Sequence, residues 1–195
     1  MSTALSPYSS RYTAERALFS FLGPAFRIRG PEGNLRFFVK QKAFRLKEEI
    51  NVWADEAQTT RVLAIKARGI ADFSGTYDVV DAATGERVGS LKREGFKSLL
   101  RDEWVLLDAD GKPFGRIRED STALALLRRF LPIIPQTFHV TVGDREVGTI
   151  QQRFHLFRLR YDVDLSGADG ETLDPRLGVA AVVLLLAIEG RQGDR

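Results

Sequence analysis

Cysteine is absent from this chain of 195 residues. Without thiols the protein has no disulfide framework, no thiolate metal site and no cysteine nucleophile. The absence also suits a reducing compartment, so we expect a protein that is cytoplasmic or peripheral to a membrane. The net charge of +3 and the isoelectric point of about 9.3 favour anionic partners, without choosing between lipid and nucleic acid.

Recognisable catalytic motifs are absent as well. The chain has no G-x-S-x-G, H-E-x-x-H or G-x-G-x-x-G sequence and no P-loop. Its two histidines, His139 and His155, fall in predicted strands, and neither forms a recognisable relay with a nucleophile. We therefore expect a protein that is not an enzyme and holds no resident cofactor.

The chain also lacks an apolar run long enough to cross a bilayer, which takes about 20 residues. The run Leu177–Ile188 has twelve residues without a polar side chain. An Asp-Pro pair before it suits a helix start, and a glycine after it suits a helix end. Such a helix, over residues 175–189, is apolar all round and has to be buried on every side. We assign it to the core, with no transmembrane span. Its structural residues are Asp174, Pro175, Val183 and Gly190.

What the chain has in abundance is one repeated pattern: a strand, a turn rich in Asp and Gly, then an apolar residue followed by glycine. Asp and Gly adopt turn conformations at low cost, so the pattern predicts β-hairpins. The glycine after the apolar residue predicts a bulge or a close backbone approach. The predicted hairpins are Tyr77–Leu91, Val105–Ile117, Val140–Ile150, Phe26–Val39 and Ile50–Arg68. The shared pairs are Val88-Gly89, Phe114-Gly115 and Val147-Gly148.

Five hairpins and their flanking strands predict a mainly β fold of about a dozen strands. Closing such a sheet into an antiparallel barrel removes its edges, and a barrel of that width needs a filling that the apolar helix can supply. We expect the barrel with its central helix over residues 26–190, and a tail over residues 191–195. Residues 1–25 are expected to be an N-terminal extension with a short helix in Tyr12–Leu22.

Four segments carry a family resemblance: Phe37–Trp53, Ala83–Arg93, Arg101–Asp120 and Leu173–Arg191. In these segments the chain resembles the tubby C-terminal-like superfamily, and within it the bacterial LURP-one-related and phospholipid scramblase-like branch. The resemblance implies a twelve-stranded antiparallel barrel around a hydrophobic C-terminal helix. It also implies a membrane- or ligand-linked binding module rather than a defined reaction.

Basic residues at outward strand positions are the first candidate site. Tubby proteins bind phosphoinositide head groups through basic residues on the barrel surface, so the resemblance implies anionic phospholipid as a partner. Converging cations on a rigid platform suit phosphate oxygens. The alternatives are an ordinary solvated surface, or an adaptor that binds protein or nucleic acid. The candidate set comprises Lys40, Lys42, Arg45, Lys47, Lys66, Arg68, Lys92, Arg93, Lys97 and Arg101. The expected phosphate ligands are Lys40, Lys42, Lys66 and Arg68.

The acidic loop Asp162–Asp174 is the second candidate. The resemblance to scramblases implies calcium here, because the matching region of scramblases, just before the final helix, is their proposed calcium loop. Asp162 and Asp164 fit the first half of an EF-hand pattern, and Glu171 supplies a further oxygen ligand. The twelfth position, however, is Leu173 instead of glutamate. The alternative is a set of exposed strand acids that lead into a turn and a helix cap.

A third candidate is the segment Ser121–Leu131, which predicts a helix that ends before Pro132. Its leucines share one face, with Arg128 and Arg129 beside them. Such a helix either packs over one end of the barrel or lies on a membrane with its arginines at lipid phosphates.

Overall fold

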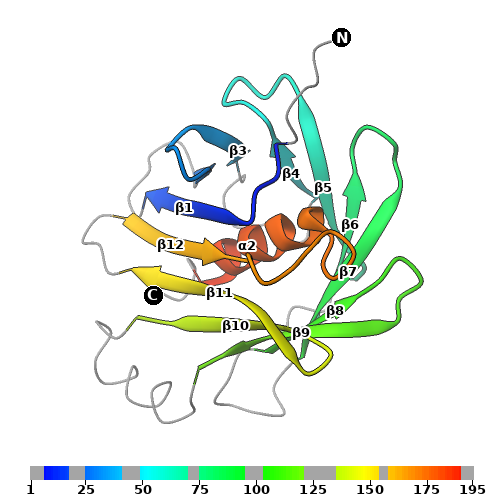
Figure 1. Ribbon diagram of the computed structural model, residues 1–195. Coiled ribbons are helices and arrows are strands. Elements are labelled where there is room, and N and C mark those ends of the chain that lie inside the picture. The colour runs from blue at the N-terminus through cyan, green and yellow to red at the C-terminus, as the bar shows by residue number, and fades with distance from the viewer. Residues whose placement is uncertain are drawn as a thin grey trace.

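The computed structural model describes residues 7–17, 25–40, 49–69, 75–94, 103–120, 135–153 and 158–189. It contains twelve strands and one described helix, drawn in Figure 1. The strands are β1 (Arg11–Ala17), β2 (Ala25–Arg29), β3 (Leu35–Lys40), β4 (Ile50–Trp53), β5 (Arg61–Ala67), β6 (Thr76–Asp81), β7 (Arg87–Glu94), β8 (Glu103–Leu107), β9 (Pro113–Glu119), β10 (Thr137–Val142), β11 (Arg145–Arg153) and β12 (Arg158–Asp164). The helix is α2 (Pro175–Glu189).

The strands close into an antiparallel barrel in which each strand pairs with its neighbours in sequence and β1 pairs with β12. All five predicted hairpins are present, as β2–β3, β4–β5, β6–β7, β8–β9 and β10–β11. Alternation along each strand sends one set of side chains inward, as the buried Leu159, Tyr161 and Val163 show on β12. The predicted fold class, a closed twelve-stranded antiparallel barrel with a C-terminal helix, is confirmed.

The three glycine-marked hairpins share a β-bulge. The pairing register between β6 and β7 skips Val88. In the same way the register between β8 and β9 skips Phe114, and that between β10 and β11 skips Val147. Each skipped residue stands directly before the marked glycine, so the predicted bulges are confirmed. A bulge increases the local twist of its strand, which helps a sheet to curl into a barrel.

The marked glycines also let neighbouring backbones come close. A Cβ added to Gly148 would lie 2.3 Å from a backbone carbonyl oxygen of the adjoining strand. The corresponding distances are 2.5 Å at Gly89 and 2.6 Å at Gly115. No side chain fits at such distances without moving a backbone, so the predicted close approach is confirmed at all three positions.

Helix α2 runs through the inside of the barrel (Figure 1). It begins at Pro175, and the Asp174 carboxylate accepts a hydrogen bond of 2.8 Å from the Arg176 backbone N–H, as an N-cap should. Val183 in its middle is fully buried, and so are its neighbours on every side of the helix. Gly190 lies outside the described residues. Among the described residues no helix has the length and apolarity that a membrane crossing requires.

The N-terminal part of the chain differs from the expectation. Arg11–Ala17 is strand β1, which pairs with β12 on one side and β2 on the other. The short helix expected in Tyr12–Leu22 is therefore wrong over these residues, and the barrel includes a strand from the expected extension of residues 1–25. Residues 18–24 and the expected tail, 191–195, lie outside the described residues.

Candidate functional site

Two of the four expected phosphate ligands, Lys66 and Arg68, form ion pairs with carboxylates. Lys66 on β5 pairs with Glu49, with 3.4 Å between Nζ and Oε2, and Arg61 shares the same carboxylate. Lys40 is exposed at the end of β3, and Lys42 lies outside the described residues. The described members therefore do not form one converging set of free cations.

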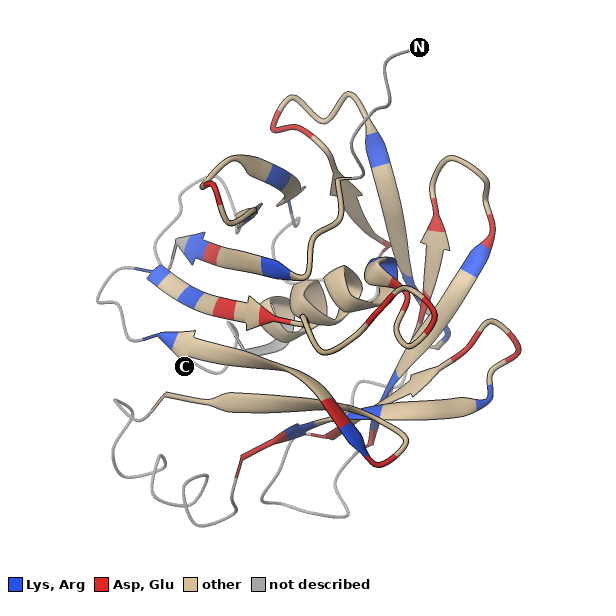
Figure 2. Cartoon of the chain, viewed as in Figure 1, with Lys and Arg blue, Asp and Glu red and all other residues tan. Residues whose placement is uncertain are grey.

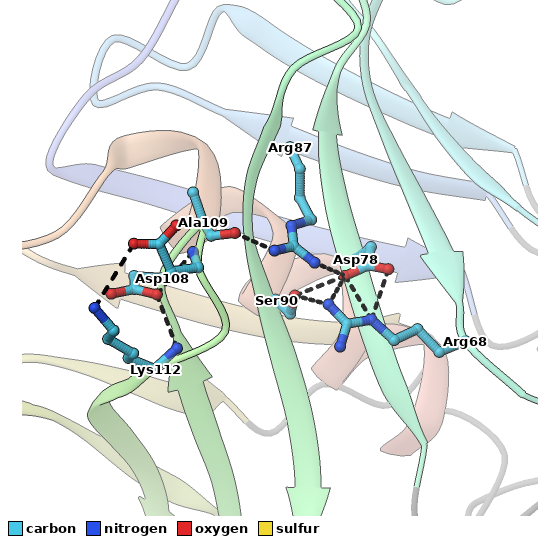
Figure 3. A network of polar contacts seen from close by, with 8 residues as sticks. Arg68, Asp78, Arg87, Ser90, Asp108, Ala109 and Lys112 are labelled. Carbon is cyan, nitrogen blue, oxygen red and sulfur yellow. Dashed lines mark hydrogen bonds and ion pairs between the residues drawn. The ribbon is translucent and has the colours of Figure 1, made fainter.

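Among the described members of the four, Arg68 makes the shortest contacts with a carboxylate. Its Nε lies 2.8 and 2.9 Å from the two oxygens of Asp78, and its Nη2 donates to Ser90 at 3.1 Å (Figure 3). Arg87 approaches the same carboxylate and also donates to the Ala109 carbonyl. Burial alone would raise the pKa of Asp78, but its hydrogen bonds from Arg68 and Ser90 hold that pKa below its ordinary value. Arg68 is thus committed to the barrel wall.

The wider candidate set behaves similarly. Lys92 pairs with Glu94 at 3.4 Å. Arg93 had been expected to point outward, yet it lies directly opposite the buried Trp104, with its guanidinium 6.0 Å from that ring centroid. The members outside the described residues are Arg45, Lys47, Lys97 and Arg101.

A different surface gathers arginines. The outward positions of the four neighbouring strands β2, β1, β12 and β11 carry six of them, which we call the arginine face. Figure 2 shows basic and acidic bands on β1 and, along β12, basic bands at the start of the strand followed by acidic bands. The arginines are Arg11, Arg27, Arg29, Arg153, Arg158 and Arg160. The acids on the outer side of the same strands are Glu15, Glu146, Asp162 and Asp164.

The strand register explains how these arginines come together. Arg27 lies opposite Glu15, Glu15 opposite Arg160, and Arg160 opposite Arg153. These four residues form one row across four strands, which spans about 14 Å at roughly 4.8 Å per strand. Three of the four positions in the row are arginine.

Two carboxylates hold the centre of the arginine face together. Glu15 pairs with Arg158 at 3.4 Å and with Arg160 at 3.8 Å. Asp162 pairs with Arg160 at 3.4 Å and with Arg153 at 2.8 Å. The result is an alternating chain of three guanidinium groups and two carboxylates, with one excess positive charge.

The remaining arginines of the face lie beside this chain. Arg11 pairs with Asp164 at 3.0 Å, Arg27 pairs with Glu56 at 2.8 Å, and Arg29 donates to the Gly33 carbonyl. Four arginines of the face lie on β1, β11 and β12, and their side chains are between 42% and 63% exposed. Guanidinium groups bind phosphate oxygens through paired, charge-assisted hydrogen bonds. The face can therefore offer several phosphate ligands on a rigid wall.

The acidic loop uses its oxygens within the fold. Asp162 and Asp164 lie on outward positions of β12 and pair with arginines, as described above, and Asp164 also accepts from the Ser166 backbone N–H at 2.9 Å. Glu171 is exposed. Within the described ranges, no three His, Asp or Glu side chains are grouped so that they could hold a metal ion. The calcium expectation thus gains no support from the geometry of Asp162, Asp164 and Glu171.

The other expected features are resolved in part. His139 lies on β10, with 3.1 Å between its Nδ1 and Glu146. His155 and the segment Ser121–Leu131 lie outside the described residues. The His139–Glu146 pair is half exposed on the outer wall, and no nucleophile is recorded beside it among the described contacts.

The arginine face is not among the predicted sites, although part of its pattern is present in the sequence. Arg27 and Arg29 alternate with apolar residues in β2, and Arg158 and Arg160 do so in β12. That alternation places each pair outside the barrel. The sequence does not show that the two strands lie on either side of β1, because the residues that form β1 were assigned to an extension.

Comparison with known proteins identifies one family. The family model described as LURP-one-related matches residues 61–181, which is well over half of the chain. The match runs from the start of β5 into α2. No curated protein and no solved structure matches the chain.

Proposed function

Because the chain belongs to the LURP-one-related family, we propose that it is a non-enzymatic binding module that recognises anionic phospholipid head groups at a membrane surface. The observation that carries the proposal is the arginine face. Its row of three arginines across four strands is rigid, exposed and richer in guanidinium groups than in carboxylates. Phosphate-bearing head groups spread over a membrane suit such an extended platform.

The contacts on β5 and β6 support the choice of the arginine face. On β5 and β6 the cations meet carboxylates in compact pairs, of which Arg68 with Asp78 is the tightest. The ligands that we propose are therefore Arg153, Arg158 and Arg160. Lys40 at the end of β3 is exposed as well. Lys42, Lys66 and Arg68 are not needed for the proposal.

The placement of the protein follows from the same proposal. A module of this kind acts in the cytoplasm and docks on the membrane peripherally. A barrel around a helix is the fold that the resemblance to the tubby C-terminal-like superfamily implies, and this fold supports the proposal that the chain belongs to that superfamily. A calcium-responsive, scramblase-like activity has no observation in its favour among the described residues.

Vesicle flotation tests the proposal. The full chain is mixed at low salt with vesicles of phosphatidylcholine, or with vesicles in which a quarter of the lipid is phosphatidylglycerol. We expect flotation with the anionic vesicles only, and a loss of binding as salt rises, because screening weakens the contacts. Equal flotation with both kinds of vesicle, or flotation with neither, contradicts the proposal.

A matched pair of variants locates the site. Replacing both Arg153 and Arg158 by Gln removes two charges from the arginine face, and at about 1 kcal/mol per basic residue the affinity should fall by tenfold or more. Replacing Arg116 and Arg118 by Gln is the control, because both are exposed on β9 and share one carboxylate, Glu103. An equal loss in the control contradicts the assignment of the face.

The same protein preparations address the main alternative. A duplex DNA fragment is titrated in place of vesicles, and its affinity is followed as salt rises. Tight binding with a steep salt dependence, in the absence of vesicle binding, would favour a nucleic-acid adaptor.

A further inference from the structure

The arginine face contains a place where two like charges meet. Arg153 on β11 and Arg160 on β12 lie directly opposite each other in the strand register. Like charges at directly opposite positions repel and destabilise a sheet. The pair is stable here because the Asp162 carboxylate lies between the two side chains.

The geometry of that carboxylate is that of a bound anion. One oxygen of Asp162 lies 2.8 Å from Nε of Arg153, and the other lies 3.4 Å from Nε of Arg160. A phosphate group that bridged the same two guanidinium groups would place its oxygens in the same positions. Asp162 therefore occupies a position from which a phosphate could contact both guanidinium groups.

The Asp162 carboxylate can also move away from the two arginines. Its side chain is 36% exposed, and its recorded hydrogen bonds come from the two arginines. Asp78, which bridges two arginines elsewhere on the barrel, is 21% exposed and is also held by the Ser90 hydroxyl. A change of rotamer carries the Asp162 carboxylate toward water and breaks only its ion pairs with Arg153 and Arg160 among the described contacts.

We propose that Asp162 is a built-in competitor for the lipid phosphate, which neutralises Arg153 and Arg160 in the free protein and is displaced when the arginine face meets an anionic membrane. This inference rests on the proposed function. Since displacement costs two ion pairs, a sparse anionic surface does not support binding and a dense one does. Asp162 thus sets the charge density at which the protein docks.

The Asp162→Asn variant tests the inference. Removal of the competing charge should raise the affinity for phosphatidylglycerol vesicles about fivefold, the effect of roughly one extra unpaired basic charge near the surface. Half-maximal flotation should also require a smaller fraction of phosphatidylglycerol. An affinity equal to that of the unchanged protein overturns the inference.

A control separates this effect from a change in net charge. Asp110 pairs with Lys112 at 3.8 Å in the β8–β9 turn, and its side chain is 78% exposed. Asp110→Asn changes the net charge by the same amount and frees one cation, but β10 and β11 separate this hairpin from β12. The comparison is therefore made at 0.1 M salt, where the Debye length of about 10 Å is shorter than the distance across those strands. We expect less than a twofold change, and a gain equal to that of Asp162→Asn overturns the inference.

Two further variants keep the test decisive. In a protein that already carries Arg153→Gln, Asp162→Asn should raise the affinity for anionic vesicles much less than it does in the unchanged protein, because Asp162 acts through Arg153. An equal gain in affinity in both proteins overturns the inference. Glu15→Gln frees Arg158 and Arg160 in the same manner, so it should also raise the affinity, and it replaces Asp162→Asn if that variant fails to fold.

The two proposals can fail separately. If the unchanged protein floats with anionic vesicles and the Arg153 and Arg158 double variant does not, but Asp162→Asn gives no gain, only the role of Asp162 is wrong. If no variant floats with anionic vesicles, the proposed function itself is wrong.

Discussion

The Asp78 carboxylate shows how a single residue on the outer wall stabilises the folded state. It accepts from the Arg68 guanidinium and from the Ser90 hydroxyl at 2.7 Å, with Arg87 nearby. Burial would raise its pKa, but these donors outweigh burial and lower the pKa below its ordinary value of 3.8. The folded state therefore binds a proton at lower pH than the unfolded state does.

This sign gives a prediction. The stability that Asp78 contributes is complete above about pH 5 and is lost as pH falls through about 4 and below. Asp78→Asn lacks the titrating group, so its deficit in unfolding free energy relative to the unchanged protein should shrink over that range. Urea denaturation at several pH values measures this deficit, and a deficit that stays constant with pH would refute the assignment.

Single residues also show what the sequence can and cannot reveal. The bulge glycines, such as Gly148, could be predicted because their role is written in the adjacent residues and repeats three times. The engagement of Arg68 by Asp78 could not, because the two residues are ten positions apart, with Arg68 directly after β5 and Asp78 within β6. Their contact depends on the pairing register, which the sequence of either strand does not specify alone.

At the scale of elements, the hairpins and α2 could be predicted because turn residues and caps mark their ends. Strand β1 could not be predicted in the same way, because its inward positions are Tyr12, Ala14 and Arg16. A small residue and a charged residue blur the alternation of apolar and polar side chains. Arg16 is nevertheless 7% exposed, with its guanidinium 5.9 Å from the centre of the Phe26 ring.

The central helix supports a second prediction. Val183 is fully buried, so Val183→Asp places a carboxylate inside the barrel, and the cost should exceed about 4 kcal/mol and unfold the domain. Val183→Ala, which leaves only a small cavity, should remain folded with a loss of about 2 kcal/mol. Circular dichroism and urea denaturation measure both. A Val183→Asp protein that stays folded and only changes its membrane affinity would show that α2 is not a core element.

At the scale of the whole molecule, the arginine face exists only because the barrel closes. Its strands are the first two and the last two of the chain, and β1 joins them. Arg158 and Glu15 are 143 residues apart in the sequence. A set of charges this far apart shows no local pattern, whereas the predicted ligands Lys40 and Lys42, and likewise Lys66 and Arg68, stand two positions apart along the chain.

The closing strand carries the last prediction. A chain that begins at residue 18 lacks β1, so β2 and β12 become open edges beside an uncovered core, and we expect aggregation. A chain that begins at residue 7 keeps every described contact of β1 and should elute in size-exclusion chromatography close to the full chain. A synthetic peptide of residues 7–17 should then bind the shortened chain and reduce its aggregation, because the β1–β12 and β1–β2 pairings supply two ladders of hydrogen bonds. A monomeric, folded chain without β1 would instead mean that β2 and β12 can meet directly, and the arginine face would lose the Glu15 carboxylate that now holds its centre.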